Sequence, residues 1–175
     1  QSDQEIIVSG NLKAKDYVVQ GDISSQFITG FMFVLPLLNQ DSTLTITEPY
    51  ESKSYVNLTI QMLAKFGIEI IETSSNSYLI KGNQHYKAQN VSVEGDFSQL
   101  AFFAVLGTLN NTLSCSNMDM SSKQGDKAIL DCIPSFTSEK DTITFTYKKP
   151  IPQTIDLSNC PDLGPILCVL ASYTN

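Results

Sequence analysis

The sequence predicts an α/β fold built from repeated βαβαββ units, and three observations predict it. A strand followed by an Asp and an apolar helix occurs three times, at Asp22, Asp96 and Asp162. The three positions are separated by roughly 70 residues each, which is the mark of a long internal repeat. Between them, strand-like alternation and helix-like apolar periodicity follow one another along the chain. Each unit must therefore hold more elements than its opening strand and helix.

The first unit shows the full set of expected elements. Its first helix is apolar on nearly every side, which predicts that it is buried. Its second helix places Tyr55, Leu58, Met62 and Phe66 on one face, and Gly67 follows it as a C-terminal cap. A turn-forming cluster separates the last two strands. The expected elements are strand 17–20, helix 23–38, strand 43–47, helix 53–66, strand 68–72 and strand 78–81.

The second unit repeats this pattern, and a third begins at residue 154 and stops inside or just after its first helix. A further strand, 5–9, completes no unit. We therefore expect the chain to be a segment cut from a longer protein, with a polar boundary at 83–90. The elements expected in the second unit are strand 91–93, helix 97–109, strand 112–115, helix 123–132, strand 133–136 and strand 142–147.

The charge of the chain narrows the kinds of partner that it can bind. The net charge is −7, and all 11 basic residues are Lys. A nucleic-acid surface needs clustered basic side chains, so we expect no nucleic-acid partner. Without Arg, this chain has no bidentate group for a phosphate or carboxylate. An anion site must therefore use helix N-termini, hydroxyl groups and Lys.

The cysteines and the apolar runs bear on location. The four cysteines lack the paired spacing of a zinc site and lie in or beside apolar runs. We interpret them as reduced, partly buried thiols, which predicts a cytoplasmic protein. The longest apolar run, 31–38, is too short to span a bilayer, so we expect no membrane association.

Two helix starts carry the residues expected for an anion site. Ser24, Ser25 and Gln26 follow a strand and a Gly, so hydroxyl donors stand beside backbone N–H groups. Ser52 and Lys53 open the next helix with similar groups. Capping alone also explains such residues, because Ser and Asp are among the commonest caps. At the third helix, Asp162 serves either as a cap or as a base for a bound hydroxyl group.

These motifs resemble the enolpyruvyl transferase family, and within it the 5-enolpyruvylshikimate-3-phosphate synthases. The resemblance covers nearly the whole chain, and the Ser-Ser-Gln triplet favours these synthases over the related UDP-N-acetylglucosamine transferases. The segments that carry it are Gly21 to Phe27, Ser52 to Tyr55, 59–67, Val93 to Asp96, Gln124 to Asp126 and Pro161-Asp162.

The resemblance implies a fold, a reaction and a set of roles. The fold is an inverted repeat of two domains of three units each, with residues 1–88 in the first domain and 89–175 in the second. The substrates are shikimate-3-phosphate and phosphoenolpyruvate, no metal or organic cofactor is implied, and the whole protein is a monomer. Ser24, Ser25 and Ser52 would hold the phosphate of shikimate-3-phosphate, Gln26 and Tyr55 would line the pocket, and Asp162 would deprotonate the attacking 5-hydroxyl.

The chain also departs from that family pattern. The Lys and Arg side chains that grip phosphoenolpyruvate have no counterpart here, so we expect the isolated chain to be inactive and prone to self-association. Ser54 stands where many relatives have Pro, a change that we expect to be tolerated. Two alternatives stay open: a non-catalytic βαβαββ module, and a segment of a UDP-N-acetylglucosamine transferase. The combination of Ser24, Ser25, Gln26 and Asp162 favours the synthase.

Overall fold

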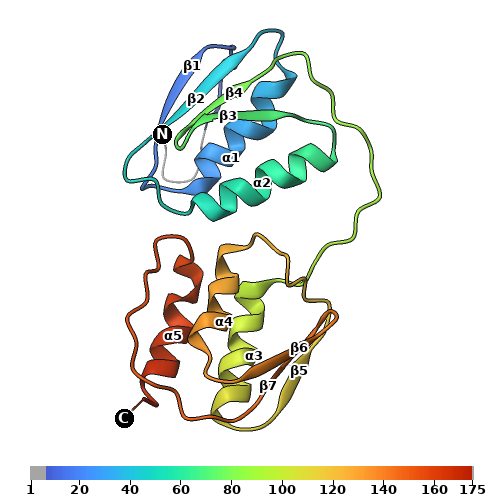
Figure 1. The fold of residues 1–175 in the computed structure, drawn as a ribbon. Helices are drawn as coiled ribbons and strands as arrows, with labels where there is room; N and C mark the ends of the chain where they lie inside the picture. The colour runs from blue at the N-terminus through green and yellow to red at the C-terminus, as the bar shows by residue number, and fades with distance from the viewer. Residues whose placement is uncertain (1–6, 175) are drawn as a thin grey trace.

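The computed structural model describes residues 7–174, which form two lobes joined by an extended linker (Figure 1). Each lobe is a small β-sheet with its helices packed on one face. The expected strand 5–9 begins outside the described residues, and residues 7–9 form no strand. None of the helices within 7–174 is long and apolar enough to cross a membrane.

The first lobe is a complete βαβαββ unit, as expected. Strands β1 and β2 are parallel, whereas β4 runs antiparallel to both β2 and β3, so the sheet order is β1-β2-β4-β3. A parallel pair needs a crossover connection, and α1 provides it. The elements are β1 (Asp16–Gln20), α1 (Ser25–Val34), the 3₁₀ helix η1 (Leu35–Leu37), β2 (Ser42–Thr47), α2 (Lys53–Lys65), β3 (Ile70–Ser74) and β4 (Ser77–Ile80).

The core of the first lobe lies between the sheet and one face of α1. Ile28 and Met32 on α1 are fully buried against Leu44 and Ile46 of β2. The opposite face of α1 is exposed, so the prediction of a wholly buried helix is wrong within this chain. Its apolar residues exceed what one sheet face can cover. The exposed ones are Phe27, Phe33 and Val34, and Leu37 of η1 is exposed as well.

The second helix also buries a different face from the one that its sequence suggests. Val56 and Leu63 of α2 point into the core and are buried. The stripe of Tyr55, Leu58 and Met62 instead lines a cavity between the lobes. The helix ends as expected, because Gly67 has φ of 82°, a left-handed conformation that favours glycine.

The second lobe keeps the topology but lacks one strand. Its sheet has the order β5-β7-β6, with both pairs antiparallel. The expected strand 91–93 does not form, and the expected helix 123–132 starts later and begins as a 3₁₀ turn. The elements are α3 (Phe97–Leu109), β5 (Leu113–Cys115), η2 (Gly125–Ala128), α4 (Ile129–Cys132), β6 (Phe136–Glu139), β7 (Thr142–Phe145), η3 (Pro161–Leu163) and α5 (Gly164–Ala171).

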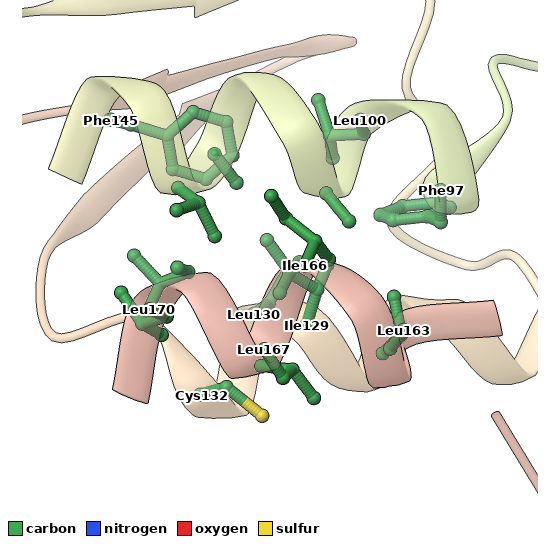
Figure 2. Packing of buried hydrophobic residues seen from close by; sticks show 14 of the residues in the cluster. Phe97, Leu100, Ile129, Leu130, Cys132, Phe145, Leu163, Ile166, Leu167 and Leu170 are labelled. Carbon is green, nitrogen blue, oxygen red and sulfur yellow. The ribbon is translucent and has the colours of Figure 1, made fainter. Parts of the chain in front are cut away.

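The core of the second lobe is formed mainly between helices. Figure 2 shows side chains of α3 pointing toward those of α4 and α5, with Phe145 of β7 beside α3. Because this cluster shares no residue with the core of the first lobe, each lobe has its own core. Cys132 is buried in it, and all four cysteines are free thiols.

The linker is fastened to the first lobe before it crosses to the second. The Tyr86 hydroxyl donates to the Phe33 carbonyl oxygen at 2.8 Å, and the Lys87 amide donates to the Phe66 carbonyl oxygen at 2.8 Å. Residues 88–93 are then exposed. The second lobe then holds the chain through Asn117. Its Nδ2 donates to the Val93 carbonyl oxygen at 3.3 Å, and its carbonyl oxygen accepts from the Gly95 amide at 2.6 Å. The chain therefore crosses between the lobes once among the described residues.

Candidate active site

The three helix starts that the sequence singles out differ in how they are capped. Ser24, rather than Asp22, caps α1, and its Oγ accepts from the Gln26 amide at 3.2 Å. Asp96 caps α3 as expected, because its Oδ1 accepts from the Ser98 amide at 2.8 Å. Asp162 lies inside the 3₁₀ turn before α5 and makes no capping hydrogen bond. Its carboxylate is exposed beside a cavity.

All six predicted site residues line one cavity of about 450 Å³. They come from three parts of the chain: the start of α1, the start of α2 and the turn before α5. The first two belong to one lobe and the third to the other, so the cavity lies between the lobes. Its predicted members are Ser24, Ser25, Gln26, Ser52, Tyr55 and Asp162.

The start of α2 brings the two lobes into contact. Ser52 has φ of 57°, and its side chain makes no capping hydrogen bond. Its amide donates to the Ser158 carbonyl oxygen at 2.9 Å, and Ser54 Oγ donates to the Asn159 carbonyl oxygen at 2.7 Å. A proline at position 54 has no hydroxyl group and cannot make this second bond. Ser54 therefore adds a hydrogen bond between the lobes. That the change from Pro is tolerated stays a prediction.

Tyr55 is the predicted site residue with a side-chain partner in the other lobe. Its hydroxyl donates to the carboxylate of Asp126, at 3.0 Å from Oδ2 and 3.2 Å from Oδ1. Burial raises the pKa of the Tyr55 hydroxyl, and the negative charges of Asp126 and Asp162 raise it further. Tyr55 therefore remains a neutral hydrogen-bond donor.

Asp126 was not assigned a role from sequence, although it stands in the Gln124-Gly125-Asp126 motif. It is 3% exposed, and this burial raises the pKa of its carboxyl group, while the hydrogen bond from Tyr55 lowers it. Asp162 and Asp96 raise the same pKa through their negative charges. A glycine before a carboxylate was the available signal, but only the fold shows that it faces Tyr55.

A second cavity of about 480 Å³ adjoins the first and shares Tyr55 and Asp162 with it. Its walls carry Glu94, Asp96 and Asp119, with Lys65 as the basic side chain among the lining residues. Within residues 7–174, no group of three or more metal-ligating side chains is placed to hold an ion. We call the 450 Å³ cavity, which Ser24, Ser25 and Ser52 line, the hydroxyl-rich cavity. It is better suited to an anion than the 480 Å³ cavity, whose walls carry several carboxylates.

Comparison with known proteins identifies the family. The protein-family model described as EPSP synthase (3-phosphoshikimate 1-carboxyvinyltransferase) matches residues 2–175 of this chain. The chain belongs to the EPSP synthase family. A 3-phosphoshikimate 1-carboxyvinyltransferase of Clostridium acetobutylicum is 48% identical over 169 residues, which cover 95% of this chain and 40% of that protein. One of Clostridium kluyveri is 44% identical over 174 residues, which cover 97% of this chain and 41% of that protein.

Solved structures agree on the fold of this EPSP synthase family chain. The enolpyruvyl transferase NikO from Streptomyces tendae matches with a TM-score of 0.75 at 16% identity, over 96% of this chain and 44% of that one. EPSP synthase from Acinetobacter baumannii matches with a TM-score of 0.68 at 17% identity, over 91% of this chain and 39% of that one. The chain thus spans about 40% of the length of its curated relatives.

Proposed function

We propose that this chain is a segment of a 3-phosphoshikimate 1-carboxyvinyltransferase, which transfers the carboxyvinyl group of phosphoenolpyruvate to the 5-hydroxyl of shikimate-3-phosphate. One observation carries the proposal: hydroxyl groups from two helix starts and a carboxylate from the other lobe line the same cavity. This arrangement supplies an anion site and a base a short distance apart.

The roles follow from chemistry and position. Ser24, Ser25 and Ser52 hold the phosphate of shikimate-3-phosphate, because hydroxyl donors at a helix start complement its charge. Gln26 and Tyr55 line the pocket as neutral polar groups. Asp162 accepts the proton of the 5-hydroxyl as the oxygen attacks C2 of phosphoenolpyruvate protonated at C3. Phosphate then leaves from the tetrahedral intermediate as C3 loses a proton.

The same proposal covers the setting of the chain. Residues 1–88 form part of the first domain and residues 89–175 part of the second, in a cytoplasmic protein that is monomeric at full length. The isolated chain is inactive, because no arginine is present to bind phosphoenolpyruvate. It self-associates through the exposed apolar face of α1. Sedimentation velocity tests this last point, and a concentration-independent monomer would refute it.

Calorimetric titration with shikimate-3-phosphate tests the site. The Ser24→Ala/Ser25→Ala variant should lose binding, because it removes two hydroxyl groups that face the cavity. The matched control is Ser74→Ala/Ser75→Ala, which removes two hydroxyl groups at the hairpin turn between β3 and β4 and should bind as wild type does.

Three further outcomes would each contradict a part of the proposal. If Ser24→Ala/Ser25→Ala bound shikimate-3-phosphate as tightly as Ser74→Ala/Ser75→Ala, the anion site would not lie at the start of α1. Heat released by UDP-N-acetylglucosamine but not by shikimate-3-phosphate would assign the chain to the related transferase. Turnover by the isolated chain would refute the prediction that it is inactive.

A further inference from the structure

The two lobes touch through a narrow contact at the start of α2. Every hydrogen bond that joins the lobes among residues 7–174 comes from Ser52, Ser54 or Tyr55. Two of these residues also line the hydroxyl-rich cavity. The geometry of the cavity and the contact between the lobes therefore depend on the same turn of helix.

Asp126 makes the side-chain to side-chain hydrogen bond of that contact, and its carboxylate is buried. A carboxylate that is 3% exposed is expensive to desolvate unless it is hydrogen-bonded. The Tyr55 hydroxyl, which comes from the other lobe, lies within hydrogen-bonding distance of both of its oxygens. A hydrogen bond to an ionised group is among the stronger ones in proteins. The contact between the lobes thus supplies the side-chain hydrogen bond that this buried carboxylate accepts.

Gly125 shows how closely the backbone beside Asp126 approaches the other lobe. A Cβ atom at this position would lie 2.2 Å from the Asn159 carbonyl oxygen and 2.4 Å from Ser54 Oγ. Such distances are far inside van der Waals contact. Only glycine therefore allows this segment to sit against both the start of α2 and the turn before α5.

We propose that Asp126 is a positioning residue, which holds Tyr55 so that the hydroxyl groups of one lobe face Asp162 of the other. The inference rests on the proposed function for its consequence in catalysis, but not for the contact itself. Asp126 acts through Tyr55 and Ser52, and it faces Asp162 and Asp96 as neighbouring charges. Removing Asp126 weakens the contact between the two halves of the site and leaves the hydroxyl groups of Ser24, Ser25 and Ser52 in place.

Amide exchange at Ser52, measured by NMR in the chain, reports the contact directly, because this amide donates across the lobes. Asp126→Ala and Tyr55→Phe should each accelerate exchange at Ser52 roughly 10-fold or more. The double variant should add little, because both substitutions remove the same hydrogen bond. Asp126→Asn keeps an acceptor oxygen and should retain most of the protection. Gly125→Ala should accelerate exchange with Asp126 and Tyr55 intact.

The matched control is Tyr50→Phe, which removes a hydroxyl group paired with Tyr78 at 3.1 Å inside one lobe. It should leave Ser52 exchange unchanged. If Asp126→Ala fails to fold, Tyr55→Phe and Asp126→Asn carry the test. Unchanged exchange at Ser52 in Tyr55→Phe, or equal acceleration in Tyr50→Phe, would overturn the inference.

Ligand binding separates this inference from the proposed function. Asp126→Ala should weaken shikimate-3-phosphate binding by roughly 10-fold, while Asp126→Asn binds nearly as wild type does. If wild type fails to bind but Ser52 exchange still responds as expected, the proposed function is wrong and the contact stands. If wild type binds and Asp126→Ala binds equally well, the positioning role is wrong.

Discussion

The N-termini of α1 and α3 occupy equivalent places in the two lobes, yet different side chains cap them. At α3, Asp96 accepts from the Ser98 amide, and Gln124 Oε1 accepts from the Phe97 amide at 2.9 Å. At α1 the neutral Ser24 hydroxyl caps the helix, and Asp22 makes no cap. A carboxylate at a helix start repels an incoming anion, whereas a hydroxyl group leaves the positive end of the helix dipole available. The two copies therefore share their topology but differ in their caps, and we expect an anion to bind at the start of α1 rather than at the start of α3.

The largest effect is expected in the core of the first lobe. Ile28→Ala should lower the free energy of unfolding of that lobe by about 3 kcal/mol, because Ile28 is fully buried. Its neighbour Phe27 is exposed, and Phe27→Ala should cost less than about 1 kcal/mol. Urea unfolding followed by amide exchange resolves the lobes, and the second lobe should be unchanged. Equal losses from the two variants would contradict the observed face of α1.

Exchanging the caps tests the comparison at the level of binding. Ser24→Asp places the α3 type of cap on α1, so it should preserve folding but weaken shikimate-3-phosphate binding by roughly 100-fold through charge repulsion. Calorimetry measures the binding, and thermal unfolding verifies that the variant is folded. The reverse change, Asp96→Ser, should leave binding near the wild-type level. Retained affinity in Ser24→Asp would show that the anion does not approach this helix start.

Substituting Asp96 and Asp22 in turn compares an aspartate that caps its helix with one that does not. Asp96→Ala should lower the free energy of unfolding by about 1 kcal/mol, because it deletes the N-cap of α3. Asp22→Ala should change it by less than about 0.5 kcal/mol, because Asp22 is exposed and caps nothing. Chemical denaturation compares the pair. A larger loss from Asp22→Ala would reverse the assignment of the caps.

The smallest effect is expected in how the free energy of unfolding changes with pH as Asp126 ionises. Burial raises its pKa in the folded state, so the folded chain binds its proton more tightly than the unfolded chain does. This contribution to stability is therefore present below the ordinary Asp pKa and is lost as the pH rises through the raised one. The free energy of unfolding of Asp126→Asn, relative to wild type, should increase between about pH 4 and pH 7. A constant difference would show that the pKa is not raised.

The sequence predicted those features that depend on local patterns. The strand and helix order of the first lobe, the glycine at position 67 and the cap at Asp96 all follow from alternation, periodicity and residue type. The α/β fold class is confirmed by the solved relatives. These features can be predicted without knowing which distant residues contact them.

The remaining features depend on contacts that no local pattern encodes. Residues 91–93 have a strand-like sequence, but a strand requires a partner, and the described chain offers them none. The apolar residues of α1 indicated burial, although one sheet can cover only one face. Asp126 was missed because its partner, Tyr55, is remote in sequence and belongs to the other lobe. Each miss concerns an interaction between distant parts of the chain.

The six exposed residues 88–93 of the linker give the contact between the lobes a further meaning. A short tether keeps each lobe at an effective concentration near the other that free solution rarely reaches, of the order of millimolar. A few hydrogen bonds then suffice to hold the lobes together, and the balance between joined and separated lobes stays within reach of small free-energy changes. A ligand that touches both lobes shifts this balance by the difference in its affinity for the two arrangements. We therefore expect such a ligand to couple binding to lobe movement at the start of α2.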